Sequence, residues 1–147
     1  MMADVIFDVD GTLMDIEHRR HHVEQKPKDW DAFREDMVYD KPNEDVVMMA
    51  KLLKEAGHRI IIATGRLEQD RALTITQLND AGVEFDFAVF RGNWERYKPD
   101  SEVKEGMLED MKKYGFNPTM AFDDRTRVVD MWRRNGLRVF QVDKGDF

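Results

Sequence analysis

Apolar residues gather in five short runs along the chain, and the stretches between the later runs alternate apolar and polar positions with a helical period. The runs are residues 5–7, 59–63, 87–90, 119–122 and 138–142. Each run is rich in β-branched and aromatic residues and almost continuously apolar, which is typical of a strand buried on both faces of a parallel sheet. The pattern therefore predicts five buried strands.

Four amphipathic helices are predicted between these strands. Their apolar stripes are Val46, Met49, Ala50 and Leu53; Ala72, Ile75 and Leu78; Val103, Met107, Leu108 and Met111; and Val128, Val129, Met131 and Trp132. A glycine follows each stripe, at positions 57, 82, 115 and 136, and can take the left-handed conformation that ends a helix. Asn43 is placed to cap the start of the first helix.

Alternating strands and helices predict an α/β fold, a Rossmann-like parallel sheet with helices on both faces. We expect residues 1–147 to form a single domain, since no linker divides them. Residues 15–41 break the alternation and predict a small, mostly helical insertion after the first strand, packed over one edge of the sheet, with no large cap. Ligands of such sheets bind at the carboxyl ends of the strands.

Composition narrows the class of protein. The chain has 147 residues, no cysteine and a formal net charge of -7. The lack of cysteine excludes disulfides, thiolate zinc sites and a cysteine nucleophile, and the acidity argues against holding nucleic acid by general positive charge. No apolar run approaches the roughly 20 residues of a membrane span, and no signal peptide is recognisable. We expect no membrane partner and a cytoplasmic location.

The first strand runs directly into Asp8-Val9-Asp10-Gly11-Thr12. Two carboxylates this close raise each other's proton affinity unless a cation offsets their charge, so the pair favours a metal or catalytic site. The alternative is a turn that uses Asp and Gly for its geometry. The motif by itself does not separate the two interpretations.

Polar residues also follow later strands. Thr64-Gly65-Arg66 ends the second strand, where a hydroxyl and backbone N–H groups suit a phosphate oxygen. Asp123-Asp124 ends the fourth strand and suits a hard cation such as Mg²⁺, although one of the two could serve only as a helix cap. Lys98, Asp100 and Lys104 follow the third strand, where a lysine either neutralises phosphate charge or is simply solvated.

Taken in order, these motifs resemble the haloacid dehalogenase superfamily of phosphatases over essentially the whole chain. In that family the first Asp attacks phosphorus and the second is the acid and base. The resemblance implies these roles: Asp8 as nucleophile; Asp10 as acid and base; Thr64, Gly65 and Lys104 as substrate contacts; and Asp8, Asp10, Asp123 and Asp124 as metal ligands for Mg²⁺. The second Asp also favours phosphate ester hydrolysis over dehalogenation or P-type ATPase chemistry.

A closer resemblance lies at the C-terminal end. The run from Asp123 to Arg134, with Gly145-Asp146-Phe147 after it, is similar to the 3′-phosphatase domain of phage polynucleotide kinase-phosphatase. Further candidate substrate contacts on this resemblance are Arg19, Arg66, Asp100, Lys104 and, within the matching run, Arg125. The match favours Lys104 over Lys98 as the phosphate lysine.

The resemblance implies Mg²⁺-dependent removal of a 3′-phosphate from a DNA or RNA end, through an aspartyl phosphate, in end repair. The chain contains no Gly-x-x-x-x-Gly-Lys-Ser/Thr loop, so we expect no 5′-kinase activity unless a separate chain supplies it. The sequence leaves open whether the chain has a separate kinase or ligase partner and whether it forms a homo-oligomer. The alternatives are a phosphatase of nucleotides or small phosphates and a non-catalytic protein that binds ends; the intact set of residues argues against the second.

A group of histidines and a pair of aromatic residues each allow several interpretations. His18, His21 and His22 suit a metal site, a substrate contact or a solvated helix face, and no fourth ligand at tetrahedral spacing is evident. Trp94 and Tyr97 either stack on a base or pack against the protein. Five acids, at positions 8, 10, 100, 123 and 124, are assigned to one site, so most of the net charge of -7 is local and does not exclude a nucleic acid substrate.

Overall fold

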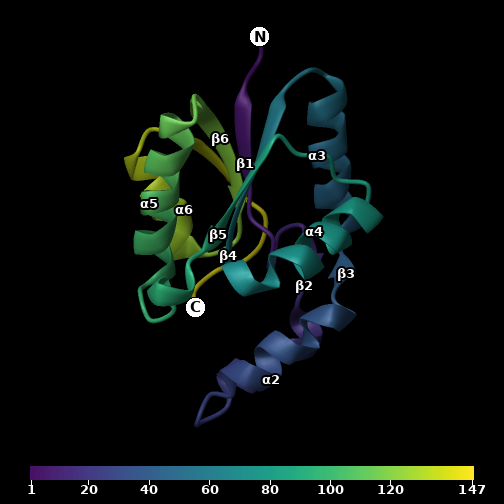
Figure 1. Cartoon of the computed structure of the whole chain (residues 1–147), viewed down its shortest axis with the longest axis vertical. Helices are drawn as coiled ribbons and strands as arrows, with labels where there is room; N and C mark the ends of the chain where they lie inside the picture. The colour runs from purple at the N-terminus through teal and green to yellow at the C-terminus, as the bar shows by residue number, and fades with distance from the viewer.

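Five parallel strands form the central sheet of the computed structural model, which describes residues 1–147 (Figure 1). The strands are β1 (Asp4–Phe7), β4 (Arg59–Leu67), β5 (Phe87–Arg91), β6 (Pro118–Asp123) and β7 (Arg138–Gln141), in the order β5-β4-β1-β6-β7. All five predicted strands are present. The main difference is that β4 continues through the predicted phosphate-binding turn, where its pairing with β5 shifts register between Thr64 and Leu67.

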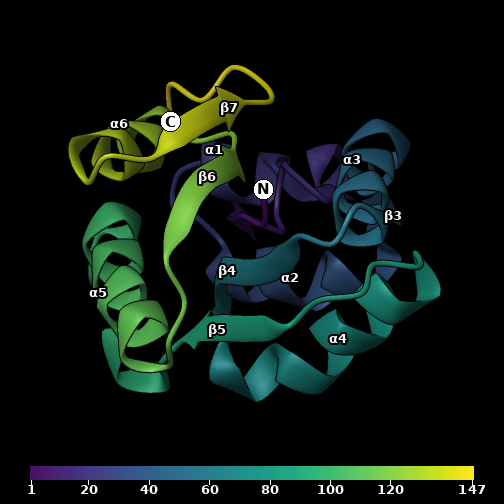
Figure 2. The ribbon, with the colours of Figure 1, turned by 90° about the horizontal axis from the view of Figure 1, so that it is seen from above.

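Helices cover both faces of the sheet, as Figure 2 shows from above. Helices α3 (Glu44–Glu55) and α4 (Arg71–Asp80) lie on one face, and α5 (Asp100–Lys113) and α6 (Thr126–Arg134) on the other. Successive residues of β1 alternate between the two faces: Val5 and Phe7 pack with α3 and α4, while Ile6 packs with α5 and α6. The two buried clusters confirm the predicted parallel sheet with helices on both faces.

The helix boundaries follow the sequence pattern, but three predicted positions differ. Met49, predicted on the inner stripe of α3, is exposed, and Val47 is buried instead. The predicted stripes of α5 and α6 are buried throughout, and all four helix-ending glycines have positive φ angles between 83° and 95°. Ala72 is exposed, however, because the inner face of α4 carries Thr74 and Gln77, which bind the Arg66 guanidinium. Asn43 precedes α3 but makes no cap bond; its amide donates instead to the Thr12 carbonyl (2.9 Å).

The insertion after β1 consists of short helices closed at their base by an antiparallel pair of strands. Its elements are β2 (Met14–Asp15), η1 (Glu17–Arg19), α1 (His21–Glu24), α2 (Trp30–Glu35), η2 (Asp36–Tyr39) and β3 (Lys41–Pro42). It projects from the carboxyl end of the sheet (Figure 1) rather than lying along an outer strand. The insertion follows the carboxyl end of β1 in the chain, and polar contacts hold it there: Arg34 pairs with Asp70 (2.7 Å), and Gln77 of α4 donates to the Met37 carbonyl (2.7 Å).

Two short 3-10 turns, η3 (Glu68–Asp70) and η4 (Asn93–Glu95), complete the elements. None of the helices combines the length and apolarity that crossing a bilayer requires.

Candidate active site

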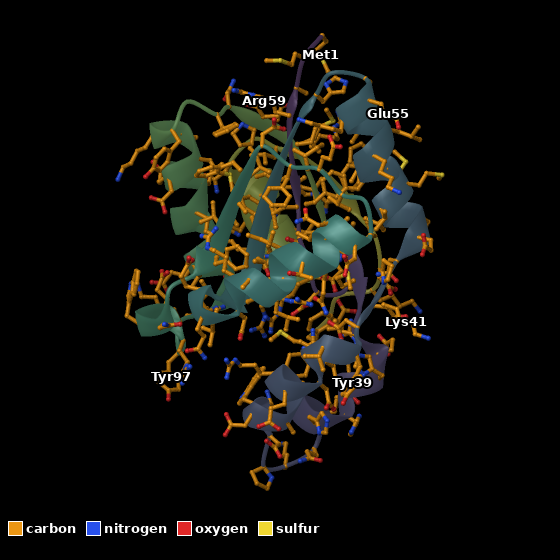
Figure 3. The ribbon with its side chains drawn as sticks, turned by 45° about the vertical axis from the view of Figure 1, so that its right-hand side comes forward. Met1, Tyr39, Lys41, Glu55, Arg59 and Tyr97 are labelled. Carbon is orange, nitrogen blue, oxygen red and sulfur yellow. The ribbon has the colours of Figure 1, made fainter.

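The predicted site residues meet at the carboxyl ends of β1, β4 and β6, beside the first turns of α5. Figure 3 shows side chains crowding the region between the sheet and the insertion, whose Tyr39 and Lys41 are labelled. The parallel sheet explains the meeting, because the ends of neighbouring parallel strands lie at one edge and bring together motifs far apart in sequence.

Three buried carboxylates and one buried ammonium form the centre of the site. Oxygen atoms of Asp8, Asp123 and Asp124 lie within 4.8 Å of one another. Lys104, which reaches in from α5, donates to Asp8 (2.8 Å) and Asp123 (3.1 Å), and its side chain is 1% exposed. One positive charge facing three carboxylates leaves the centre with an excess of negative charge.

The electrostatics of this centre fit a bound cation. Burial, and then the charge of Asp123, raise the pKa of Asp8; the same two causes raise the pKa of Asp124 to about 6. Burial opposes the Lys104 charge, but the Asp123 and Asp8 carboxylates outweigh it and raise the lysine pKa. Oδ2 of Asp124 is buried without a hydrogen-bond partner. An all-oxygen donor set with an unpartnered oxygen is the kind that Mg²⁺ binds.

Neighbouring residues hold these carboxylates in place. Thr12 donates to Asp8 (3.3 Å), and the Trp132 indole N–H donates to Asp123 (3.1 Å). Gly11 has a φ of 78°, and a Cβ there would collide with the Asp124 carboxylate, so this turn requires glycine. Trp132 was predicted only as a core residue; its indole is a polar contact of the site that sequence reasoning missed.

Asp10 lies in a different environment from Asp8, although only one residue separates them. The structure does not bring its carboxylate into the oxygen cluster; Oδ1 accepts from Arg19 (2.9 Å) and Arg66 (2.8 Å). Burial opposes ionisation of Asp10, but the charges of Arg66 and Arg19 outweigh burial and lower its pKa. Direct metal ligation by the Asp10 side chain, expected from the sequence, therefore finds no support in its position.

Asp40 is the residue of this site that sequence reasoning missed most completely. Its side chain is fully buried and accepts from both Arg19 (2.8 Å) and Arg66 (2.8 Å), while His18 contacts it at 2.6 Å. Two arginines and two carboxylates thus form one cluster that joins the insertion to β4. The signal that could have found Asp40 is charge balance, because two buried arginines need more than the single carboxylate of Asp10.

The predicted phosphate-binding turn is organised around Thr64. Its buried hydroxyl accepts from the Arg66 backbone N–H (3.0 Å), which leaves the hydroxyl hydrogen available for a phosphate oxygen. A Cβ at Gly65 would lie 2.7 Å from Oδ1 of Asp100, so the close approach of this turn to α5 requires glycine.

Asp100 lies among positive groups at the start of α5. It accepts from Arg91 (2.9 Å), and Lys104 and Arg125 are 4.0 and 3.8 Å away. Burial opposes its ionisation, but the charges of Lys104 and Arg91 outweigh burial and lower its pKa. Asp100 therefore acts on these cations, and a direct contact of its carboxylate with phosphate is electrostatically unfavourable.

The remaining candidates lie outside the centre. Lys98 is half exposed and lies 4.0 Å from Glu95, whereas Lys104 contacts Asp8. The histidines do not gather around a common point: His18 binds Asp40, and His22 binds Asp36 at 2.7 Å. Trp94 and Tyr97 are 83% and 93% exposed, so packing against the protein does not account for them.

The fold and this set of side chains together define a phosphatase of the haloacid dehalogenase class. The family model described as the polynucleotide kinase PNKP phosphatase domain matches residues 2–147. The chain belongs to that family.

Solved structures agree with the assignment. The chain is similar to a protein of the Pnkp1/Rnl/Hen1 RNA repair complex, with 30% identity and a TM-score of 0.82 over 99% of this chain and 44% of that one. A second structure of the Pnkp1/Rnl/Hen1 complex gives 29% identity and a TM-score of 0.81, over 99% of this chain and 47% of that one. A predicted phosphatase from Clostridium acetobutylicum shares the fold at 17% identity, with a TM-score of 0.70 over 96% of this chain and 84% of that one. The chain thus spans less than half the length of its first two relatives.

Proposed function

We propose that this protein is a Mg²⁺-dependent phosphomonoesterase that removes the 3′-phosphate from a nucleic acid end. The observation that carries the proposal is the separation of two neighbouring carboxylates: Asp8 faces Lys104 and the oxygen cluster, while Asp10 faces two arginines. When two neighbouring carboxylates lie in different environments, their pKa values differ and they can take different roles in catalysis. The family match supports a polynucleotide end as the substrate.

In the proposed reaction Asp8 attacks phosphorus and the bond to the leaving 3′-oxygen breaks, which leaves an aspartyl phosphate on Asp8. Asp10 gives a proton to the leaving oxygen and then takes one from the water that hydrolyses the aspartyl phosphate. Thr64 and Lys104 hold phosphate oxygens. Bound Mg²⁺, held by Asp8, Asp123 and Asp124, would supply the charge that lets a carboxylate approach a phosphate dianion.

The arginine pair sets the starting state of Asp10. Because Arg66 and Arg19 favour the ionised carboxylate, Asp10 is ready to act as a base in the free protein. A phosphate dianion bound beside it raises its proton affinity, which allows the same group to carry a proton into the first step. In both steps the arginines hold the Asp10 carboxylate in one position beside the site.

The biological context is proposed from the relatives. Their structures are of the Pnkp1/Rnl/Hen1 complex, named as an RNA repair complex, and this supports a role in repair for the present chain. We infer that this chain acts in nucleic acid end repair, with a kinase or ligase in the same or another chain.

A phosphate-release panel tests the substrate class. With Mg²⁺ present, we expect faster release from a 3′-phosphorylated oligonucleotide than from its 5′-phosphorylated counterpart or a 3′-mononucleotide, and no release in EDTA. Equal rates on the mononucleotide and the oligonucleotide would favour a nucleotidase instead. Release from small phosphates with none from any oligonucleotide would contradict the proposed function while leaving the phosphatase class intact.

Metal binding and pH are linked through the acidic centre. The folded-state pKa values of Asp8 and Asp124 lie above their ordinary value of 3.8, so the contribution of each to stability is present below about pH 4 and is lost as pH rises through its folded-state pKa, which is about 6 for Asp124. Mg²⁺ requires the ionised carboxylates and offsets their repulsion. We therefore expect Mg²⁺ to raise the melting temperature more at pH 7.5 than at pH 5. An equal increase at both values, measured by scanning calorimetry, would contradict this account of the centre.

A further inference from the structure

The segment after β7 folds back onto the loop that carries Asp123 and Asp124. Val142 donates to the Asp123 carbonyl (3.1 Å), and Thr126 donates its backbone N–H to Gly145 (2.9 Å). A Cβ at Gly145 would collide with the Asp124 carbonyl, so the segment approaches as closely as only glycine permits. These contacts fix the segment against the acidic centre, and Figure 1 places the C-terminus at the carboxyl end of the sheet.

Phe147 of this segment contacts two arginines. Its ring centroid is 4.7 Å from the guanidinium of Arg20 and 5.2 Å from that of Arg125, and its carbonyl accepts from Nε of Arg125 (2.9 Å). The residue is 45% exposed. An aromatic ring therefore remains accessible at the rim of the site, held by two cations and a hydrogen bond.

One of the two arginines reaches the acidic centre, and the other reaches Asp100 beside it. Arg20, which comes from the insertion, lies 3.8 Å from Oδ2 of Asp124, and Arg125, at the start of α6, lies 3.8 Å from Asp100. The ring and both guanidiniums are thus continuous with the proposed phosphate site. The exposed Trp94 and Tyr97 show no such contact with the metal-binding carboxylates.

We propose that Arg20, Phe147 and Arg125 form a subsite for the nucleotide that bears the 3′-phosphate, with the ring stacking on its base and the guanidiniums binding the neighbouring phosphodiester. This inference rests on the proposed function. Aromatic faces beside arginines are what bind single-stranded nucleic acid without reading its sequence. The subsite also supplies positive charge at the mouth of an acidic centre that would otherwise repel a polyanion.

The test compares two substrates on matched variants. Substrates are a 3′-phosphorylated oligonucleotide and glycerol 2-phosphate, which has no base; the readout is the ratio of their kcat/KM values. We expect Phe147→Ala to lower this ratio on the order of tenfold, as loss of one stacking contact does, and Phe147→Tyr to restore it. Arg20→Gln should lower the ratio as well. Trp94→Ala is the control, an exposed aromatic outside the subsite, and should leave the ratio unchanged.

The possible outcomes test the proposed subsite and the proposed function independently. If the wild type hydrolyses the oligonucleotide and both Phe147→Ala and Arg20→Gln keep its ratio, the subsite is overturned and the function stands. If Trp94→Ala lowers the ratio in their place, the aromatic turn after β5 holds the strand and the subsite is wrong. If the wild type hydrolyses only glycerol 2-phosphate, the proposed function fails. Melting temperatures identify a variant that is destabilised, and Arg20→Gln then decides the question because it leaves the C-terminal segment intact.

Discussion

Asp8→Asn is expected to abolish phosphate release, by on the order of 10³-fold or more, while the protein keeps its fold. The amide matches the carboxylate in shape, so its oxygen can still accept from Lys104, as Asp8 does at 2.8 Å. What is lost is the nucleophile, because an amide oxygen is a far poorer nucleophile than a carboxylate and forms no aspartyl phosphate. Phosphate release and circular dichroism on the same preparation measure both parts of the prediction.

The stability of Asp8→Asn depends on the charge that the substitution removes. The pKa of Asp8 is raised by burial and by Asp123, so the ionised side chain is held at a cost in the metal-free protein. Replacing it with a neutral group removes one of the three carboxylates and the cost of ionising it, so the melting temperature without Mg²⁺ should be at least that of the wild type at pH 7.5. Asp36→Asn, which removes an acid paired with His22 in the insertion, is the matched control and should keep full activity. Retained activity in Asp8→Asn would exclude Asp8 as the nucleophile.

The sequence was sufficient to predict the residues that lie at the carboxyl ends of the parallel strands, because the sheet brings these ends together. Asp8 directly follows β1, Asp123 ends β6, and Thr64 lies near the carboxyl end of β4, so their meeting is a consequence of strand geometry. The resemblance favoured Lys104 over Lys98 as the phosphate lysine, and the structure agrees. Of these two lysines, only Lys104 is buried, on the inner face of α5.

The parts that sequence reasoning missed depend on contacts between irregular segments. Asp40 is 21 residues from Arg19 and 26 from Arg66, across short helices with no clear hydrophobic period. The same arginine cluster explains why Asp10 lies outside the oxygen cluster and why α4 buries Thr74 as well as the apolar Leu78. These contacts could not be predicted because a hydrophobic pattern does not show which charged side chains are buried or which of them pair with one another.

Lys104→Met is expected to affect both activity and stability, because Lys104 is the buried positive charge that donates to two carboxylates of the centre. It donates to Asp8 and Asp123 and lies 4.0 Å from Asp100, with a side chain only 1% exposed. Met has a similar length and no charge, so the change leaves buried carboxylates without their partner. Breaking a buried pair from one side costs about 3–5 kcal/mol. Activity should fall by roughly 100-fold or more, since a charge that holds the phosphate is also lost.

The pH dependence distinguishes lost charge from lost packing. If unpaired carboxylates cause the instability of Lys104→Met, the deficit in unfolding free energy relative to the wild type should be largest near pH 7.5 and shrink toward pH 5, where carboxylates with raised pKa values take up protons. Mg²⁺ should recover part of the stability but not the activity. Lys98→Met, at a half-exposed position on the same segment, is the control and should change stability by no more than about 0.5 kcal/mol. A deficit of equal size at both pH values would mean that the aliphatic stem of Lys104, rather than its ammonium, stabilises this end of the sheet.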